Sequence, residues 1–184
     1  MQLKQLDLPG GGLLTVYLRD CVETMPLAME RPLVLVVPGG GYSHVSAREG
    51  DPVALQFAAA GYHTAVMRYA ICDEAKNCLP LRQLAAAIGL VRQHAAAWHV
   101  QPDKIAVCGF SAGGHLALSL LEAGFADEFL LHLAPRILGD NEAAPLFDGR
   151  SPLTMAEALD LRVCRTSLCD GDVHLQLRPA IPQE

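Results

Sequence analysis

Residues 109–113 read Gly-Phe-Ser-Ala-Gly, and this spacing can present the Ser111 hydroxyl as a nucleophile. The preceding segment, IAVCGF, is apolar and predicts a strand, whereas the following segment is rich in Ala and Leu and predicts a helix. A sharp turn between the two lifts the serine oxygen above the carboxyl edge of the sheet. The oxygen then lies at a helix N-terminus, where the helix dipole favours developing negative charge. We therefore predict that Ser111 is the nucleophile of an acyl-transfer reaction.

A second glycine turn, PGGGY at residues 38–42, directly follows another apolar run. Acyl transfer builds an oxyanion that backbone N–H groups must stabilise, and glycines let the backbone turn such donors inward. A serine on such a tight strand-to-helix turn is called a nucleophile elbow. In proteins with this elbow, one oxyanion donor is the N–H of the residue after the serine, and the other lies in the loop after the third strand. The matching positions are Ala112 and Gly40 or Gly41. Because the loop lacks the G-x-G-x-x-G and G-K-[ST] patterns of phosphate-binding turns, we predict an oxyanion hole here.

Strand and helix patterns alternate along the chain, and these elements must position Ser111 and the glycine loop. Two short alternating segments around the turn at 9–12 predict an antiparallel hairpin at a sheet edge. The expected strands then lie at 31–37, 62–71, 105–110 and 128–135, and the expected helices lie at 50–60, 81–98 and 112–123.

This order predicts an α/β fold, a three-layer sandwich with a mostly parallel twisted sheet and antiparallel strands at its edges. Because crossover connections are right-handed, we expect residues 128–135 to add as a parallel strand beside 105–110. After a loop rich in Gly, Pro and Asp, a short helix and two strands around the turn CDGD follow. We expect one domain over residues 1–184.

The composition excludes several classes of protein. The net charge is −6 and no cluster of Lys and Arg stands out, which argues against a nucleic-acid partner. The six cysteines have irregular spacing without C-x-x-C, so neither a metal site nor a disulfide scaffold is expected. No signal peptide and no membrane-spanning run is recognisable, and we expect a cytoplasmic protein that does not bind membranes.

Residues from about 31 to 121 resemble the α/β-hydrolase fold, and within it the acetyl-esterase and hormone-sensitive-lipase-like carboxylesterases. The segment PGGGYSHVSAREGDPVALQFAAAGYHTAVMRY resembles their oxyanion loop and first helix, and AAAWHVQPDKIAVCGFSAGGHLA resembles their nucleophile elbow. A proline stands where these enzymes often have a histidine before the glycine trio. The resemblance implies hydrolysis of small acyl esters, such as acetylated sugars or aryl esters, with no metal and no organic cofactor.

The tail resembles a different family. From about residue 118 to 179 the chain is similar to the C-terminal part of the riboflavin-biosynthesis reductase domain, which has a dihydrofolate-reductase-like fold. The segments that carry this resemblance are LLEAGFADEF, LAPRILGDN and a closing hairpin that ends in LRP. The two resemblances meet inside one predicted helix, so we interpret the chain as a chimera of a hydrolase-like part, 1–121, and a reductase-tail-like part, 122–184. The last strands of the hydrolase sheet are then expected to be missing.

The hydrolase family places a carboxylate and then a histidine after its serine. His174 is late enough in the chain for this order, and Asp172 lies on the same face of its predicted strand, where it could orient the imidazole. His44, in the continuation of the oxyanion loop, is a second candidate base, because loops carry function. His115, one helical turn after the serine, is expected to face away from it. The other histidines are expected in solvated, capping or satisfied core roles: His63, His94, His99 and His132.

Two other functions stay open at this point. One is a non-catalytic α/β scaffold that keeps the elbow without a working base, or a hybrid protein of no catalytic function. The other is a reductase-derived NADPH-binding module, which ranks last because the cofactor half of that family has no match here. An open sheet edge would also favour a homodimer.

Overall fold

The computed structural model describes residues 1–21, 24, 29–137 and 158–180. The chain divides into two compact units, residues 1–117 and 118–184, and the division falls inside one helix. Each unit is described by itself. The single domain expected from the sequence stays a prediction.

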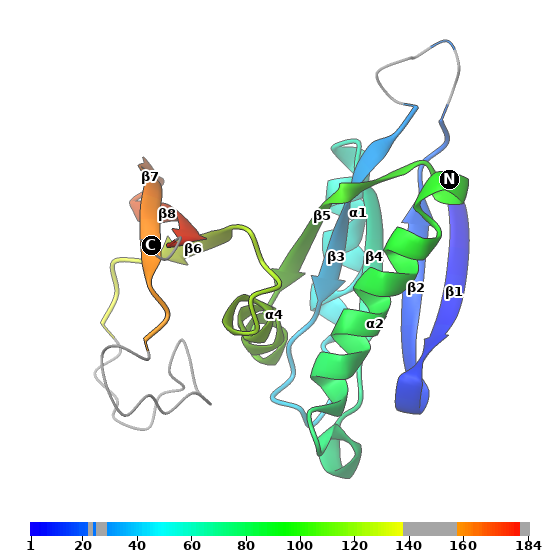
Figure 1. Ribbon diagram of the computed structural model, residues 1–184, viewed down its shortest axis with the longest axis horizontal. Helices are drawn as coiled ribbons and strands as arrows, with labels where there is room; N and C mark the ends of the chain where they lie inside the picture. The colour runs from blue at the N-terminus through cyan, green and yellow to red at the C-terminus, as the bar shows by residue number, and fades with distance from the viewer. Residues whose placement is uncertain (22–23, 25–28, 138–157, 181–184) are drawn as a thin grey trace. The chain divides into compact units, whose positions relative to one another are not determined.

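Unit 1 contains the elements up to the first half of α4 (Figure 1). Its strands are β1 (Gln2–Leu8), β2 (Gly12–Leu18), β3 (Arg31–Val37), β4 (His63–Arg68) and β5 (Val100–Gly109). Its α-helices are α1 (Asp51–Ala59), α2 (Leu79–Gln93), α3 (Ala95–Trp98) and α4 (Ala112–Glu122), and short 3-10 turns lie at η1 (Pro9–Gly11), η3 (Ala47–Glu49) and η4 (Cys72–Ala75).

The five strands form one sheet in the order β1-β2-β4-β3-β5. β3 pairs parallel with β4 and with β5, which places the carboxyl ends of these three strands at one edge. β1 and β2 form the predicted antiparallel hairpin, and β2 continues antiparallel onto β4. The α/β class predicted from the sequence, with a parallel core and antiparallel strands at its edge, is confirmed.

Helices cover both faces of this sheet, with α2 in front and α1 behind in Figure 1. The face toward α1 holds a core of Val34, Val36, Ala54 and Val66. On the opposite face the alternate residues of β3 are also fully buried, and α2 turns Leu84, Ala87 and Val91 inward at helical spacing. Burial on both faces explains why β3 is a continuous apolar run.

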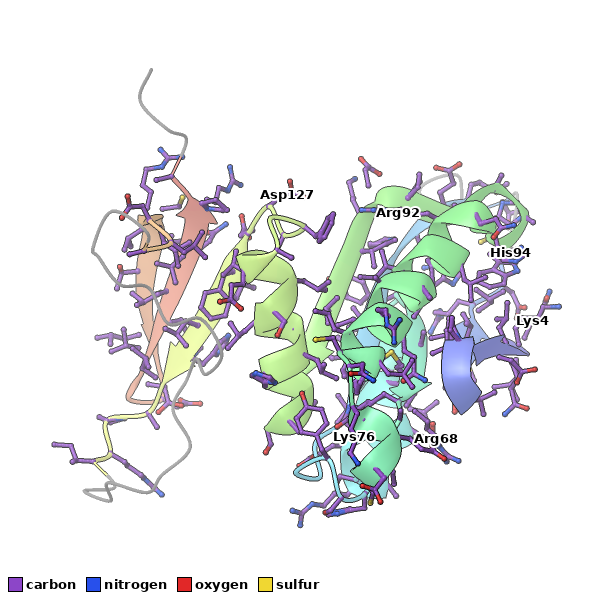
Figure 2. The ribbon with its side chains drawn as sticks, turned by 60° about the horizontal axis from the view of Figure 1, so that its bottom comes forward. Lys4, Arg68, Lys76, Arg92, His94 and Asp127 are labelled. Atoms are coloured by element: carbon purple, nitrogen blue, oxygen red, sulfur yellow. The ribbon has the colours of Figure 1, made fainter. Side chains whose placement is uncertain are left out.

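The long helix predicted at 81–98 is interrupted near its end. Among the described residues α2 ends at Gln93, and a separate turn, α3, begins at Ala95. His94 lies at this break and stacks on Trp98, with ring centroids 4.6 Å apart and planes at 18°. Figure 2 shows His94 and Arg92 at one end of α2 and Lys76 near the other.

Unit 2 contains a three-stranded antiparallel sheet in the order β6-β8-β7, built from β6 (Phe129–Leu133), β7 (Leu161–Cys169) and β8 (Asp172–Pro179). Asp170 and Gly171 join β7 to β8 with positive φ angles of 51° and 92°, as a two-residue hairpin turn requires. The hairpin around CDGD is therefore confirmed. The short helix predicted before it begins at residue 155, outside the described residues.

The predicted place of residues 128–135 is wrong. β6 does not join β5 as a parallel strand; it pairs antiparallel with β8, from Phe129 opposite Leu177 to Leu133 opposite Val173. The reason is that a strand on the returning hairpin offers β6 a full ladder of antiparallel hydrogen bonds, which are stronger per residue than parallel ones. β5 consequently pairs with β3 alone among the described strands.

Candidate active site

Ser111 occupies a strained turn between the end of β5 and the start of α4. Its φ angle is +49°, a left-handed conformation that L-residues other than Asn and Asp rarely adopt. Two backbone hydrogen bonds close the turn: Phe110 N–H donates to Val37 O at 3.1 Å, and Gly113 N–H donates to Phe110 O at 2.8 Å. The serine side chain is exposed. This is the strand–turn–helix context that the motif predicts.

The two flanking glycines are required by close backbone approach. A Cβ on Gly113 would overlap Val37 O and lie 2.6 Å from Pro38 O, at the end of β3. A Cβ on Gly109 would lie 2.6 Å from the carbonyl carbon of Gly113. No side chain fits at either position without moving backbone, so the elbow is seated directly against the start of the loop that carries the glycine trio.

The glycine loop lies beside the serine. A Cβ built on Gly39 would lie 2.9 Å from Ser111 Cβ and 3.0 Å from Glu49 Oε2. The Gly39 N–H donates to the same Glu49 oxygen at 2.9 Å, so this amide is occupied. The spacing of the sequence pointed to the loop but not to Glu49, which only the folded loop brings beside Gly39.

The N–H groups of Gly40 and Gly41, predicted as oxyanion donors, are oriented by hydrogen bonds to the neighbouring carbonyl groups. The Gly39 carbonyl accepts the Ser46 N–H at 2.9 Å, and the Gly40 carbonyl accepts the Ser43 N–H at 3.0 Å. In a trans peptide the N–H points opposite to the C=O, so these bonds turn the Gly40 and Gly41 N–H groups the other way. Within the part of the chain that the structure describes, neither amide donates to a protein acceptor.

The third predicted donor, the Ala112 N–H, is oriented by α4. The Ser111 carbonyl of the same peptide accepts the His115 N–H at 2.9 Å, as the first bond of the helix. The Ala112 N–H therefore points out of the helix N-terminus, where the first N–H groups have no helical acceptor. Among the described residues it has no protein acceptor either. Three unpaired amides thus belong to the loop and the elbow that adjoin Ser111.

An aromatic cluster supports both segments. Tyr42 Oη lies 2.7 Å from His115 Nδ1 and donates to Ala112 O at 3.3 Å. Tyr69, which is buried, donates its hydroxyl to Pro38 O at 2.7 Å. Burial raises the pKa of each phenol to about 12, so both keep their proton near neutral pH. Sequence reasoning missed these contacts, although Tyr42 directly follows the glycine trio.

The candidate bases belong to different units of the chain. His174 belongs to β8 of unit 2, where its ring lies 4.0 Å from that of His132 on β6, and Asp172 begins the same strand opposite Cys169. His44 is exposed, and its Nδ1 lies 3.1 Å from Ser43 Oγ. His115 contacts Tyr42, as described. Among the described residues of unit 1, no histidine forms a hydrogen bond with the Ser111 hydroxyl.

Two histidines differ from their expected surroundings. His63 is fully buried rather than solvated: its Nδ1 accepts the Arg19 N–H at 3.0 Å, and its Nε2 lies 3.2 Å from His99 O. His132 is exposed rather than in a core, and it lies on β6, an edge strand of a three-stranded sheet. Neither position was evident from the sequence, since both depend on which segments pack beside the strand.

No metal centre or membrane span emerges from the described part of the chain. No group of three or more His, Cys, Asp and Glu side chains there could hold a metal ion. No helix in residues 1–21, 24, 29–137 and 158–180 is long and apolar enough to cross a membrane.

The parallel sheet and the serine elbow define an α/β hydrolase, and comparison with known families specifies it further. Residues 23–129, more than half of the chain, match the BD-FAE family, and the chain belongs to this family. Residues 106–175 match the RibD C-terminal domain. The two resemblances predicted from the sequence are therefore confirmed, and the matched ranges overlap around the elbow helix.

Named relatives share only part of their length with this chain. It is 32% identical over 95 residues to endo-1,4-beta-xylanase B of Butyrivibrio fibrisolvens, covering 50% of this chain and 15% of the relative. It is 32% identical over 85 residues to acetylxylan esterase of Xylanibacter ruminicola, covering 46% of this chain and 18% of the relative. The solved structure of MGS-M1, an α/β hydrolase enzyme from a Medee basin deep-sea metagenome library, has 41% identity and a TM-score of 0.63, over 65% of this chain and 50% of that one.

Proposed function

We propose that the protein hydrolyses small acyl esters, acetylated sugars among them, with Ser111 as the nucleophile. The observation that carries the proposal is the strained serine at φ +49°, seated against a loop whose Gly40 and Gly41 amides are unpaired. The acetylxylan esterase of Xylanibacter ruminicola, similar over 85 residues, supports acetyl esters as the substrate class.

In the proposed reaction the Ser111 oxygen attacks the ester carbonyl carbon and passes its proton to a base. The carbonyl oxygen becomes an oxyanion, and the N–H groups of Gly40, Gly41 and Ala112 donate hydrogen bonds to it. The C–O bond to the alcohol then breaks, the alcohol leaves with a proton, and water releases the acid from the acyl-serine. No metal or organic cofactor is needed for these steps.

The base is assigned to His174, oriented by Asp172, with His44 as the competing candidate. His174 follows the serine in the order that the hydrolases use, and Asp172 shares its face of β8. We expect His174→Gln to lower kcat for p-nitrophenyl acetate at least about a hundredfold, the lower range for losing a general base. His94→Gln, which changes a histidine that stacks on Trp98, is the matched control. A loss in His44→Gln instead would move the assignment to the loop.

The test of the proposal is p-nitrophenyl acetate hydrolysis by the purified protein beside its Ser111→Ala variant. Turnover that is present in the parent and lost in the variant is expected. Equal background rates in both proteins would contradict the proposal.

One observation favours a second function, a non-catalytic scaffold. Within unit 1, none of the described histidines forms a hydrogen bond with the Ser111 hydroxyl. Without a base, a serine and an oxyanion hole retain only about 10³-fold acceleration over water. A weak, Ser111-dependent rate that none of the histidine substitutions lowers would support the scaffold.

A further inference from the structure

The hydroxyl of Tyr42 links the oxyanion loop to the elbow helix. It lies 2.7 Å from His115 Nδ1 and 3.3 Å from Ala112 O, and the Tyr42 and His115 rings meet edge to face at 87°. Tyr42 directly follows Gly41 in the chain. The phenol contacts the elbow helix, while its own backbone continues directly from the loop amides.

The direction of these hydrogen bonds follows from the donors available. Tyr42 has one proton, so both contacts are hydrogen bonds at once when His115 is the tautomer that donates its Nδ1–H to the phenol oxygen and the phenol donates to the Ala112 carbonyl. The two bonds form a directed chain from imidazole to phenol to helix carbonyl. Removal of the phenol oxygen leaves both the His115 Nδ1–H and the Ala112 carbonyl without this partner.

The backbone at Tyr42 is itself strained, which indicates that the contacts around this residue hold it in an unfavourable conformation. Its φ angle is +58°, a region that costs a bulky L-residue roughly 1–2 kcal/mol. The Cys72 N–H fixes its carbonyl at 2.7 Å, and Tyr69 packs edge to face on its ring with centroids 5.9 Å apart. Such strain persists where the surroundings over-determine it, often at functional sites.

We propose that Tyr42 is a positioning residue of the oxyanion hole. Its hydroxyl, held by His115 and bonded to Ala112 O, sets the separation between the Gly40 and Gly41 amides of the loop and the Ala112 amide of the elbow. The inference rests on the proposed esterase function and deepens it.

Steady-state hydrolysis of p-nitrophenyl acetate by Tyr42→Phe tests this role. The oxyanion exists only in the transition state, so misplaced donors lower kcat and leave KM unchanged. We expect kcat to fall about tenfold and KM to stay within about twofold, since the donors are displaced rather than removed. Tyr17→Phe is the matched control: Tyr17 loses an equivalent hydroxyl, bonded to Asp51 at 2.7 Å, and should keep the parental kcat.

Conservative replacement of His115 separates positioning from packing. The side-chain amide of Asn can place an N–H near the position of His115 Nδ1, whereas Leu fills space without a donor. We expect His115→Asn to retain most of the parental kcat and His115→Leu to resemble Tyr42→Phe. Equal losses in the Asn and Leu variants would contradict a role through the hydroxyl.

Amide hydrogen exchange reports on the loop whether or not the protein turns over. The Ser43 and Ser46 N–H groups donate to the Gly40 and Gly39 carbonyls, so faster exchange at both residues in Tyr42→Phe than in Tyr17→Phe is expected. Equal kcat in Tyr42→Phe and Tyr17→Phe, with turnover lost in Ser111→Ala, would overturn the positioning role and leave the proposed function intact. Absence of any Ser111-dependent turnover would overturn the proposed function. Equal exchange in Tyr42→Phe and Tyr17→Phe would then overturn the positioning role of Tyr42 as well.

Discussion

At the scale of single residues, the structure concentrates backbone strain where chemistry is proposed. Ser111 and Tyr42 both have left-handed backbone angles, and the Tyr42 hydroxyl contacts the carbonyl of Ala112, the residue after the serine. A left-handed conformation costs an L-residue about 1–2 kcal/mol, which tertiary contacts must offset. The hydrogen bonds of Phe110 and Gly113 that close the elbow supply such contacts.

The strain at Ser111 leads to a stability prediction. We expect Ser111→Gly to have a free energy of unfolding about 1 kcal/mol higher than Ser111→Ala, because glycine adopts positive φ without steric cost. Both variants lack the hydroxyl, so the comparison isolates the backbone. Urea unfolding of the two variants measures the difference, and a less stable glycine variant would contradict the strain.

His63 should make the stability of unit 1 depend on pH. Burial, the largest cause, lowers its pKa below the usual value of about 6.5 in an unfolded chain. The unfolded state therefore binds the proton first, and the folded state loses stability as pH falls below about 6.5 toward the lower folded pKa. Above that value the neutral imidazole keeps its two hydrogen bonds and no stability is lost.

Urea unfolding between pH 5 and 8 checks this dependence. We expect His63→Gln to flatten the decline below about pH 6.5, since glutamine has no proton to gain there. His94→Gln, which changes a partly exposed histidine stacked on Trp98, serves as the control and should keep the slope of the parent. A parental slope in His63→Gln would show that another group is responsible.

At the scale of elements, one buried amide joins three segments of unit 1. Gln83 on α2 donates to Pro9 O at 2.7 Å and accepts the Ala70 N–H at 2.7 Å. It is fully buried, and it ties the turn of the β1–β2 hairpin to the chain just after β4. A polar residue on the inward face of an amphipathic helix is therefore satisfied by backbone groups of two loops.

We expect Gln83→Leu to lower the free energy of unfolding by about 1–3 kcal/mol, because it leaves the buried Ala70 N–H without its acceptor and removes the hydrogen bond to Pro9 O. Gln93→Leu, at the exposed end of α2, is the control and should change stability by less than about 0.5 kcal/mol. A cost at Gln83 no larger than that at Gln93 would show that the two hydrogen bonds do not stabilise the fold. Chemical denaturation of both variants provides the measurement.

The elements that carry the site were predictable, and their mutual contacts were not. Local glycine spacing predicts the elbow and the oxyanion loop, because close backbone approach at Gly113 and the turn at Gly40 allow no other residue. The bonds of Glu49 to Gly39 and of Tyr42 to His115 join residues ten and 73 positions apart, and no local pattern encodes them. The strand pattern of residues 129–133 was likewise correct, but its partner depended on a distant hairpin.

At the scale of the whole chain, β5 is one of the two edge strands of the unit 1 sheet. Among the described strands it pairs with β3 alone, and its second half, from Ile105 to Gly109, carries no charged side chain. An edge strand with unpaired backbone groups and no charge is a template for pairing with another chain. The homodimer expected from the sequence stays a prediction on this basis.

Sedimentation velocity over a range of concentrations tests self-association through β5. We expect the sedimentation coefficient of the parent to rise with concentration, and Ala106→Lys, which adds a charge at an exposed position of the edge, to shift that rise to higher concentration. Asp103→Lys keeps a charge where β5 already has one and serves as a control. A parent that sediments as a monomer throughout would contradict this prediction.

Covalent capture of the serine tests the central claim most directly. A fluorophosphonate reacts with an activated serine and leaves a stable adduct, which peptide mass spectrometry can locate. Trypsin releases residues 105–136 as one peptide, in which Ser111 and Ser119 are the two hydroxyl-bearing residues. We predict an adduct on Ser111, absent from Ser119 and from the Ser111→Ala protein. An unmodified peptide under conditions that label a known serine esterase would contradict the claim that this elbow presents a working nucleophile.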